Sequence, residues 1–557
     1  MYNLSLTSFG CRAGLNWIED YTILKAISTT VVNVIHRTSR LRGNDYAVMA
    51  AVRQCMACTV GRLSCWLIPA NMLLLAGCAS LVPQPLDGHL ADAGQVADCV
   101  AFMRDVDRQV AAASVTDAQT ARISGFPYLR SNRFLAAFRD APAADSRAWW
   151  TALRKLGQRG WQVELANLPA DDGVWARLGV ANRAAAGRRL AACTDQLAAQ
   201  DRQDPAARRL LRERSAVADA YADYQRILGL YPLTALAARQ GIHDLYMDIR
   251  ATFNRRPDNL PVVGTLTDYQ PPTVTGSPAL PADYADVPRN ALGVPQLSEQ
   301  QIAALFRRHA PIWRIDVARA ADYPGRPYWE SPAKPSIDTA DPVVYRKISY
   351  TRWQDQTLLQ LNYVVWFPAR PLTGPMDLLG GHLDGLTWRV TLAPDGKPLL
   401  YDSMHNCGCY HMAFPTAALQ PRQPQGFWQE PLLVPATAPE LQDDERIRLR
   451  IEQGTHYLQA VEAVAMAKQT TRPERRYRWD NYAALRSLPD NNAGRRSLFN
   501  PRGLVPGTER LERWLLWPMG VPDPGAMRQW GTHATAFVGK RHFDDPDLIE
   551  RYFTTAP

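Results

Sequence analysis

The sequence of 557 residues lacks the motifs of several common enzyme classes, and its N-terminal apolar run is too short to span a bilayer. It contains no glycine-rich phosphate loop, no His-Glu-X-X-His motif and no Gly-X-Ser-X-Gly motif. These patterns mark many nucleotide-binding proteins, zinc proteases and serine hydrolases. The run from Leu67 to Ala76 is much shorter than the roughly 20 residues that a membrane-spanning helix needs. The sequence therefore gives these classes no support.

Positive charge is not concentrated in one part of the chain. The chain has 63 Lys and Arg against 54 Asp and Glu, which gives a formal net charge of +9. Arginines are interspersed with acidic residues, and there is no internal repeat or low-complexity tract. A nucleic-acid-binding surface needs basic residues clustered on one face. We therefore expect no nucleic-acid partner.

A short motif, Leu75-Ala76-Gly77-Cys78, ends the apolar run and is followed by Ala79. Arg53 and Arg62 precede the run, as in a secretory signal with a basic start and a small-residue cleavage site. The motif resembles the lipobox of bacterial lipoproteins, which implies a diacylglycerol on the Cys78 sulfur and cleavage just before it. The same resemblance implies two or three acyl chains in total, and Ala79 rather than Asp favours the outer membrane.

The first 48 residues precede the basic part of this signal and carry three acidic residues. Met49 or Met56 is a better start, so we expect residues 1–48 to be an over-long extension. Residues 1–77 carry seven basic and three acidic residues, a net +4. Subtracting this +4 from the total of +9 leaves +5 on the mature chain, a mildly basic surface.

Cysteine usage is compatible with an oxidising compartment. Of nine cysteines, four precede the expected cleavage point and Cys78 is the lipidated residue, which leaves Cys99, Cys193, Cys407 and Cys409. An even remainder in an exported protein is consistent with disulfides. We favour Cys99–Cys193, which would join two predicted helices, and Cys407–Cys409, although four cysteines permit three pairings.

Helical spacing dominates residues 89–254. This part is mostly rich in Ala, Leu and Arg, and apolar residues recur at helical spacing, as at Val96, Val100 and Met103. Asp204-Pro205 has the form of a helix start with proline at the first helical position. These features predict a helical N-terminal region.

The remaining chain changes character twice. Residues 255–297 are rich in proline, which predicts an extended, solvated linker or a long arm lying over the next domain. A predicted helix at 298–308 then leads into strand-like segments, with a hairpin turn at Pro394-Asp395-Gly396 and a further helix at 446–467. We expect an α+β fold, a helical N-terminal region followed by a C-terminal domain with an antiparallel sheet and packed helices. The expected units are a dubious extension plus signal peptide (1–77), a lipidated tether (78–88), the helical region (89–254), the linker (255–297) and the α+β domain (298–557).

Histidines and cysteines, which can act as metal ligands, bases or nucleophiles, are concentrated just after the predicted hairpin. His405, Cys407, Cys409 and His411 fall within seven residues of a chain that has ten histidines and nine cysteines. At about 3.3 Å per residue, an extended strand would hold the outer pair roughly 20 Å apart, so the four cannot share one zinc ion in that form. A turn at Gly408 would bring the thiolates together.

Three chemical interpretations of this loop remain open beside a purely structural buried cluster. Zinc would bind Cys407 and Cys409 with histidines from elsewhere, His382 and His533 above all, with His542 as a further partner. A small Cys407–Cys409 disulfide would lock the turn or exchange with a partner. A cysteine nucleophile would need His405, His411 or His382 as base, oriented by Asp384 or Asp402; the resemblance to the L,D-transpeptidase motif is limited to Gly-Cys, with His411 in place of the arginine.

Two functions follow as hypotheses. The first is a lipid-anchored binding or scaffold protein on the periplasmic face of the outer membrane, with a structural Cys-Gly-Cys element and an unidentified envelope component as partner. The second is a zinc- or cysteine-dependent hydrolase or transferase of the envelope that uses the loop from His405 to His411.

Replacing Cys78 tests the expected lipid attachment and membrane location. The Cys78→Ser chain is expected to stay uncleaved and unacylated, because the modified sulfur is missing. Intact mass and membrane fractionation measure this; a mass and a fractionation unchanged by the substitution would refute the lipoprotein assignment.

Overall fold

The computed structural model describes residues 96–142, 146–169, 172–272, 284–422, 426–466, 473–490 and 494–556. The lipobox motif, Cys78 and the expected tether lie outside these residues. The described chain combines helices with antiparallel and mixed sheets, so the α+β class is confirmed. None of the helices described is long and apolar enough to cross a membrane.

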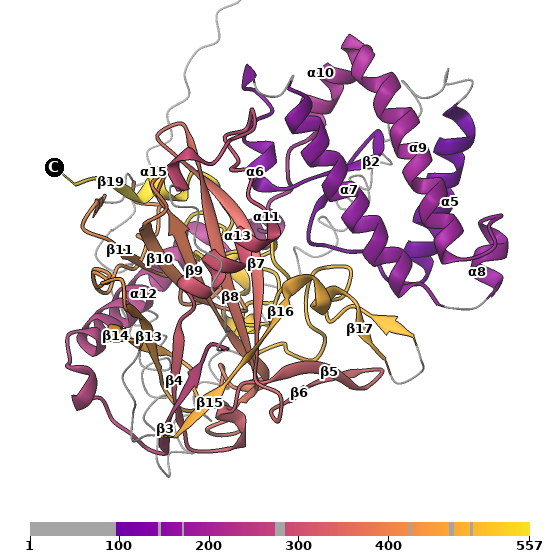
Figure 1. Ribbon diagram of the computed structural model, residues 1–557. Helices are drawn as coiled ribbons and strands as arrows, with labels where there is room; N and C mark the ends of the chain where they lie inside the picture. Colours follow the sequence, from indigo (N-terminus) through magenta and orange to yellow (C-terminus); the bar gives the residue numbers. More distant parts are fainter. Residues whose placement is uncertain are drawn as a thin grey trace, which may run out of the picture.

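The helical region surrounds one apolar cluster and lies to one side of the sheets (Figure 1). Its elements are α5 (Ala97–Ala112), β1 (Ala121–Ile123), β2 (Phe126–Ser131), α6 (Arg133–Ala136), α7 (Arg147–Asn167), α8 (Asp172–Arg177), α9 (Arg183–Gln203) and α10 (Pro205–Arg214). As predicted, α10 begins with Pro205, and the Asp204 side chain accepts a hydrogen bond from the Ala206 amide.

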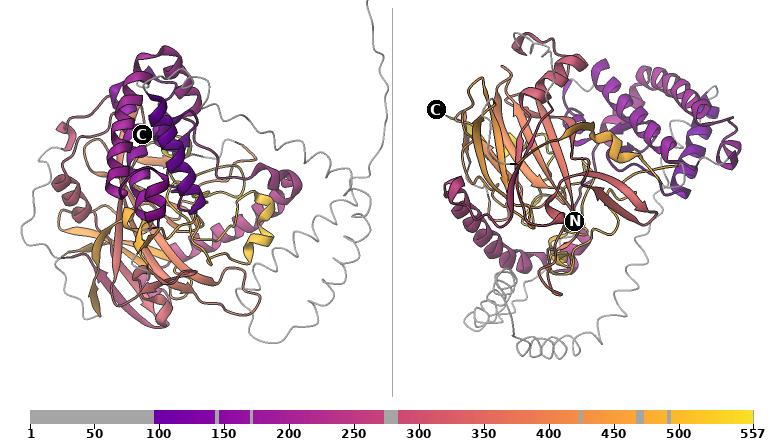
Figure 2. Two further views of the ribbon diagram at one scale, coloured as in Figure 1. Left: turned by 90° about the vertical axis from the view of Figure 1, so that its right-hand side faces the viewer. Right: turned by 60° about the horizontal axis from the view of Figure 1, so that its bottom comes forward.

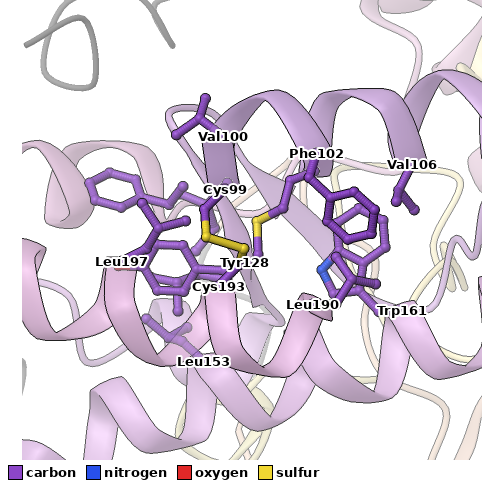
Figure 3. Close-up of a cluster of buried hydrophobic side chains, with 14 of the residues drawn as sticks. Cys99, Val100, Phe102, Val106, Tyr128, Leu153, Trp161, Leu190, Cys193 and Leu197 are labelled. Carbon is purple, nitrogen blue, oxygen red and sulfur yellow. A yellow bond between two sulfur atoms is a disulfide. The ribbon is translucent and has the colours of Figure 1, made fainter. Parts of the chain in front are cut away.

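A disulfide joins Cys99 of α5 to Cys193 of α9, which confirms the first expected pairing. Figure 3 shows the bond inside the apolar cluster, between Leu197 on one side and Phe102 and Leu190 on the other. Because it links residues 94 positions apart, it removes many conformations from the unfolded chain.

The two largest sheets, of six and five strands, lie in the rest of the fold and share one apolar cluster. Tyr363 and Trp388 of the six-stranded sheet pack in it with Trp313 and Leu449 of the five-stranded sheet. The six-stranded order is β11-β10-β9-β8-β7-β16: β7 (Val343–Trp353), β8 (Gln356–Arg370), β9 (Gly381–Leu392), β10 (Pro398–His405), β11 (Met412–Pro415) and β16 (Arg478–Asn481). The five-stranded order is β14-β13-β4-β3-β15: β3 (Thr265–Gln270), β4 (Ile312–Val317), β13 (Glu445–Ile451), β14 (Leu458–Ala465) and β15 (Glu474–Arg476).

The expected antiparallel sheet is present in β7 to β11, whereas β16 pairs parallel with β7 and β13 pairs parallel with β4. The predicted turn between β9 and β10 is confirmed, with Gly396 at φ +84°.

The remaining elements are α11 (Asp223–Leu228), α12 (Tyr231–Phe253), η3 (Pro257–Asn259), η4 (Tyr284–Asp286), α13 (Glu299–Arg308), η5 (Ala320–Asp322), β5 (Arg326–Ser331), β6 (Lys334–Asp338), β12 (Leu419–Pro421), η6 (Tyr482–Arg486), β17 (Leu488–Pro489), β18 (Arg495–Arg496), α14 (Glu512–Leu515), η7 (Trp517–Met519), α15 (Leu548–Tyr552) and β19 (Phe553–Thr555).

The predicted helix at 446–467 is wrong, because this segment forms β13 and β14, which pair antiparallel. Ile447, Leu449 and Ile451 alternate with arginines and point into the shared core. This is a period of two, the period of a strand with one buried face.

The division into a helical region and a linker also needs correction. Strand β3, inside the supposed linker 255–297, pairs with β4 and β15 in the five-stranded sheet. Helix α12 lies beside β13 and β14, away from α7 and α9 (Figures 1 and 2). Its Tyr246, Ile249 and Phe253 pack against the core of the sheets, so α12 belongs structurally to the sheet domain.

The disulfide is expected to stabilise the fold by about 2–4 kcal/mol. Cys99→Ala, Cys193→Ala and the double variant should lower the free energy of unfolding by about the same amount, because each loses the same bond once. Urea denaturation measures this. Additive losses, or a loss below about 0.5 kcal/mol, would contradict the assigned role.

Candidate functional site

The turn between β10 and β11 holds the predicted cluster in a compact form. The His405 amide donates to the Cys409 carbonyl at 3.0 Å, and the Gly408 amide donates to the His405 carbonyl at 2.7 Å. Gly408 has φ +94°, and a Cβ there would lie 2.5 Å from the Ala534 carbonyl oxygen. Glycine is therefore required, both for the backbone conformation and for the close approach of the segment around Ala534.

The second expected disulfide is not formed, because Cys407 and Cys409 have free thiols. Their turn is already closed by the backbone hydrogen bonds, and the Cys409 amide also donates to the Cys407 sulfur at 3.4 Å. The hydrogen bond with Cys407 and burial raise the pKa of Cys409 well above its usual range. Because a nucleophile must be the thiolate, this environment opposes activation of Cys409.

The candidate bases do not contact these thiols. Across the described residues no histidine nitrogen hydrogen-bonds to Cys407 or Cys409; His405 and His411 contact aspartates instead. A nucleophile–base pair of the expected kind is therefore not assembled.

The candidate zinc ligands are likewise not gathered. His382 Nε2 lies 2.5 Å from the Pro335 carbonyl oxygen, whereas His533 Nε2 lies 3.2 Å from the Asn406 carbonyl oxygen. His542 contacts Asp219 and Asp545 instead. The described ranges contain no group of three or more His, Cys, Asp or Glu residues placed to hold a metal ion.

His411 belongs to a buried structural cluster. Its Nε2 lies 3.1 Å from Asp402, whose two carboxylate oxygens also accept hydrogen bonds from Nε and Nη2 of Arg389. Burial lowers the pKa of His411 to about 4 against the opposing effect of Asp402. Burial alone would raise the pKa of Asp402, but the positive charge of Arg389 and the hydrogen bonds from His411 and Arg389 together outweigh it, and the pKa is lowered. An ionised Asp402 therefore fixes a neutral His411.

His405 belongs to a second buried cluster, in which the sequence analysis suggested Asp384 as its partner but did not indicate His456 or Asp322. His405 Nδ1 lies 3.3 Å from Asp384, and His456 Nδ1 lies 2.8 Å from the other oxygen of that carboxylate. His456 Nε2 faces Asp322 at 3.6 Å, and its ring stacks on Phe367. These residues come from separate elements, so no local spacing could have joined them.

The two aspartates determine the direction in which the pKa of His456 is shifted. Burial would lower the pKa of His456, but the two aspartates together outweigh burial and raise the pKa: Asp384 hydrogen-bonds to Nδ1, and Asp322 faces Nε2 at 3.6 Å. In contrast, burial lowers the pKa of His405 despite Asp384. The two carboxylates thus favour the protonated form of His456, whereas burial favours the neutral form of His405, whose ring contacts those of Tyr410 and Tyr457.

A large cavity of about 1150 Å³ lies against the Cys407–His411 turn. Its other walls include α12, the end of α11, the segment from α14 to η7 and residues 534–537; most of the lining is apolar. Tyr410 and Tyr457 line it beside the two cysteines, and the Tyr457 hydroxyl donates to the Tyr410 hydroxyl at 2.7 Å. The turn is therefore one wall of a cavity, a role that its local motif did not reveal.

The cavity opens among exposed apolar side chains. Leu233 and Leu236 of α12 line it while they are 52% and 42% exposed, and Leu515 of α14 is 38% exposed. Leu228, the last residue of α11, and Leu230, just before α12, are exposed lining residues as well. Apolar surface of this kind commonly marks an interaction or ligand-binding site.

Comparison with protein-family models, curated proteins and solved structures finds no match to this chain. A function must therefore be argued from the cavity and its walls.

The free thiols give a direct test of the site. Denatured but unreduced mature protein is expected to have two thiols that react with Ellman's reagent, Cys407 and Cys409. The native protein should react slowly, because Cys407 is buried and the pKa of Cys409 is raised. Cys407→Ala should reduce the count to one. A count of zero, with a Cys407–Cys409 bridge in the peptide map, would contradict the structure.

Proposed function

We propose that this protein is a lipid-anchored envelope protein that binds an amphiphile, with the hydrocarbon chain of the ligand in the cavity beside α12. The observation that carries the proposal is the cavity of about 1150 Å³ with a mostly apolar lining. Small-molecule sites are typically apolar concavities of about 300–1,000 Å³ with a few polar groups. This cavity has the same apolar character, is somewhat larger than that range, and has room for a long hydrocarbon chain.

The energetics favour a chain-like ligand. Each methylene group moved from water into an apolar site contributes about 0.8 kcal/mol, so a ligand of this kind gains affinity with chain length. The polar groups at the Cys407–His411 turn lie at one wall of the cavity. A ligand whose hydrocarbon chain lies in the apolar part of the cavity would therefore place its polar head group near Tyr410 and Tyr457.

The proposed location rests on the lipobox resemblance of Cys78 and on the outer-membrane preference of Ala79. The Cys99–Cys193 disulfide supports export, because such bonds persist in oxidising compartments. In this proposal the Cys-Gly-Cys turn is structural. The alternative hydrolase or transferase gains no support from thiols without a histidine partner or from the dispersed zinc candidates.

Filling the cavity should abolish binding. Ala238 of α12 lines the cavity, whereas Ala251 of the same helix is exposed and does not line it. Ala238→Trp is expected to weaken binding of a fluorescent alkyl probe at least about tenfold. The indole would occupy space that the hydrocarbon chain of the probe needs, so that about two or more of its methylene groups would no longer be buried. Ala251→Trp should bind as the unmodified protein does.

Fluorescence titration with probes of eight to sixteen carbons gives the measurement. Affinity that rises with chain length in the unmodified protein is expected. No binding, or equal weakening by both tryptophan variants, would overturn the proposal.

A further inference from the structure

One acidic side chain at the cavity lacks the partners that the other buried carboxylates have. Glu512 begins α14, lines the cavity and is 8% exposed. Its carboxylate makes no hydrogen bond or ion pair with any of the residues that the structure describes. The backbone nearby leaves room for it, because a Cβ at Gly525 would lie 2.1 Å from Glu512 Oε1.

Glu430, which lines the same cavity, shows the contrast. Its carboxylate accepts hydrogen bonds from Arg541, from the Tyr246 hydroxyl and from the Phe537 and Val538 amides. A buried carboxylate without such partners is costly. The unpaired Glu512 therefore indicates a missing partner, and the cavity is where that partner has access.

The surroundings of Glu512 favour a positively charged partner. Tyr410 and Tyr457 line the same cavity, and the Glu512 charge acts on both hydroxyls and on the Cys409 thiol. Tyrosine rings attract cations through their π faces, and a carboxylate forms strong hydrogen bonds with an ammonium group.

The nearby arginines do not hydrogen-bond to the Glu512 carboxylate. Arg370 donates to the Tyr457 hydroxyl at 3.0 Å. Arg510 donates through Nη2 to the Leu383 carbonyl at 2.5 Å, while its Nη1 has no hydrogen-bond partner among the described residues. Neither forms an ion pair with Glu512, although both act on it through space, as does the negative charge of Asp377. A ligand cation could therefore reach the carboxylate from the cavity without displacing an existing ion pair.

We propose that Glu512 is the head-group site of the cavity, and that it binds the protonated amine of a long-chain amphiphile whose hydrocarbon chain lies along α12. This inference rests on the proposed function and names the chemical class of its ligand. Tyr410 and Tyr457 contribute aromatic contacts to the same amine.

Glutamine at position 512 tests the site without changing its shape. Competition against the fluorescent alkyl probe should show dodecylamine binding the unmodified protein about tenfold to a hundredfold more tightly than dodecanol, since a hydrogen bond between charged groups is worth more than a neutral one. Glu512→Gln should remove this preference and leave the affinities for dodecanol and the probe unchanged. Glu509→Gln, outside the cavity lining, is the matched control and should behave as the unmodified protein does.

The amine preference should also depend on pH. Burial raises the pKa of Glu512 to about 7, against the lowering effect of Arg370 and Arg510. Glu512 is thus ionised above pH 7 and neutral below it, while an alkylamine stays protonated throughout this range. Dodecylamine affinity should fall as pH falls from 8 to 6, and Glu512→Gln should abolish this dependence.

Equal binding of dodecylamine and dodecanol to the unmodified protein would overturn the head-group assignment, as would tighter binding of dodecanoate. The assignment would also fail if Glu512→Gln weakened all ligands alike, since this would make Glu512 a structural residue. Each result differs from failure of the proposed function, in which no alkyl probe would bind at all.

Discussion

Buried negative charge on the neighbouring strands β9 and β10 is the constraint on which the site depends. Asp384 and Asp402 are both enclosed by protein, and an ionised carboxylate in such surroundings must be paired. Arg389 and His411 pair with Asp402, while His405 and His456 pair with Asp384. These contacts fix both ends of the turn that carries the cysteines, and they give its histidines a structural role.

The cavity depends on a different kind of packing. Helix α12 has one fully buried residue, Ala235, and it rests on the core of the sheets through only a few aromatic and aliphatic side chains. The space that remains between α12 and the turn is the cavity. A turn held by buried hydrogen bonds and ion pairs thus forms one wall, and a lightly packed helix forms another, an arrangement suited to admitting a ligand. Glu512 is the exception among the buried acids because its partner is proposed to come from the ligand.

Features encoded by adjacent residues could be predicted from the sequence. The start of α10 at Pro205 and the hairpin turn at Gly396 depend on local backbone chemistry, and both are found. The pairing of Cys99 with Cys193 followed from cysteine arithmetic. The failure at residues 446–467 came from reading the period wrongly, since the alternation of Ile447, Leu449 and Ile451 with arginines is itself a strand signal.

Features that depend on tertiary packing could not be predicted in this way. His456 and Asp322 join His405 only through the folded sheets, and nothing near His456 in sequence marks it as their partner. The placement of α12 against the sheets was hidden because its amphipathic pattern fits any apolar surface equally well. Glu512 sits in a short helical turn without a recognisable motif, so only its burial and its lack of a partner distinguish it.

Native mass spectrometry of the full-length protein, extracted from membranes with a mild detergent, tests most directly whether the cavity holds an amphiphile. The account predicts one bound small molecule per chain, identified after release as having a long hydrocarbon chain, and its loss from the Ala238→Trp variant but not from Ala251→Trp. A protein that carries no such molecule and takes up none when long-chain amphiphiles are added would contradict it.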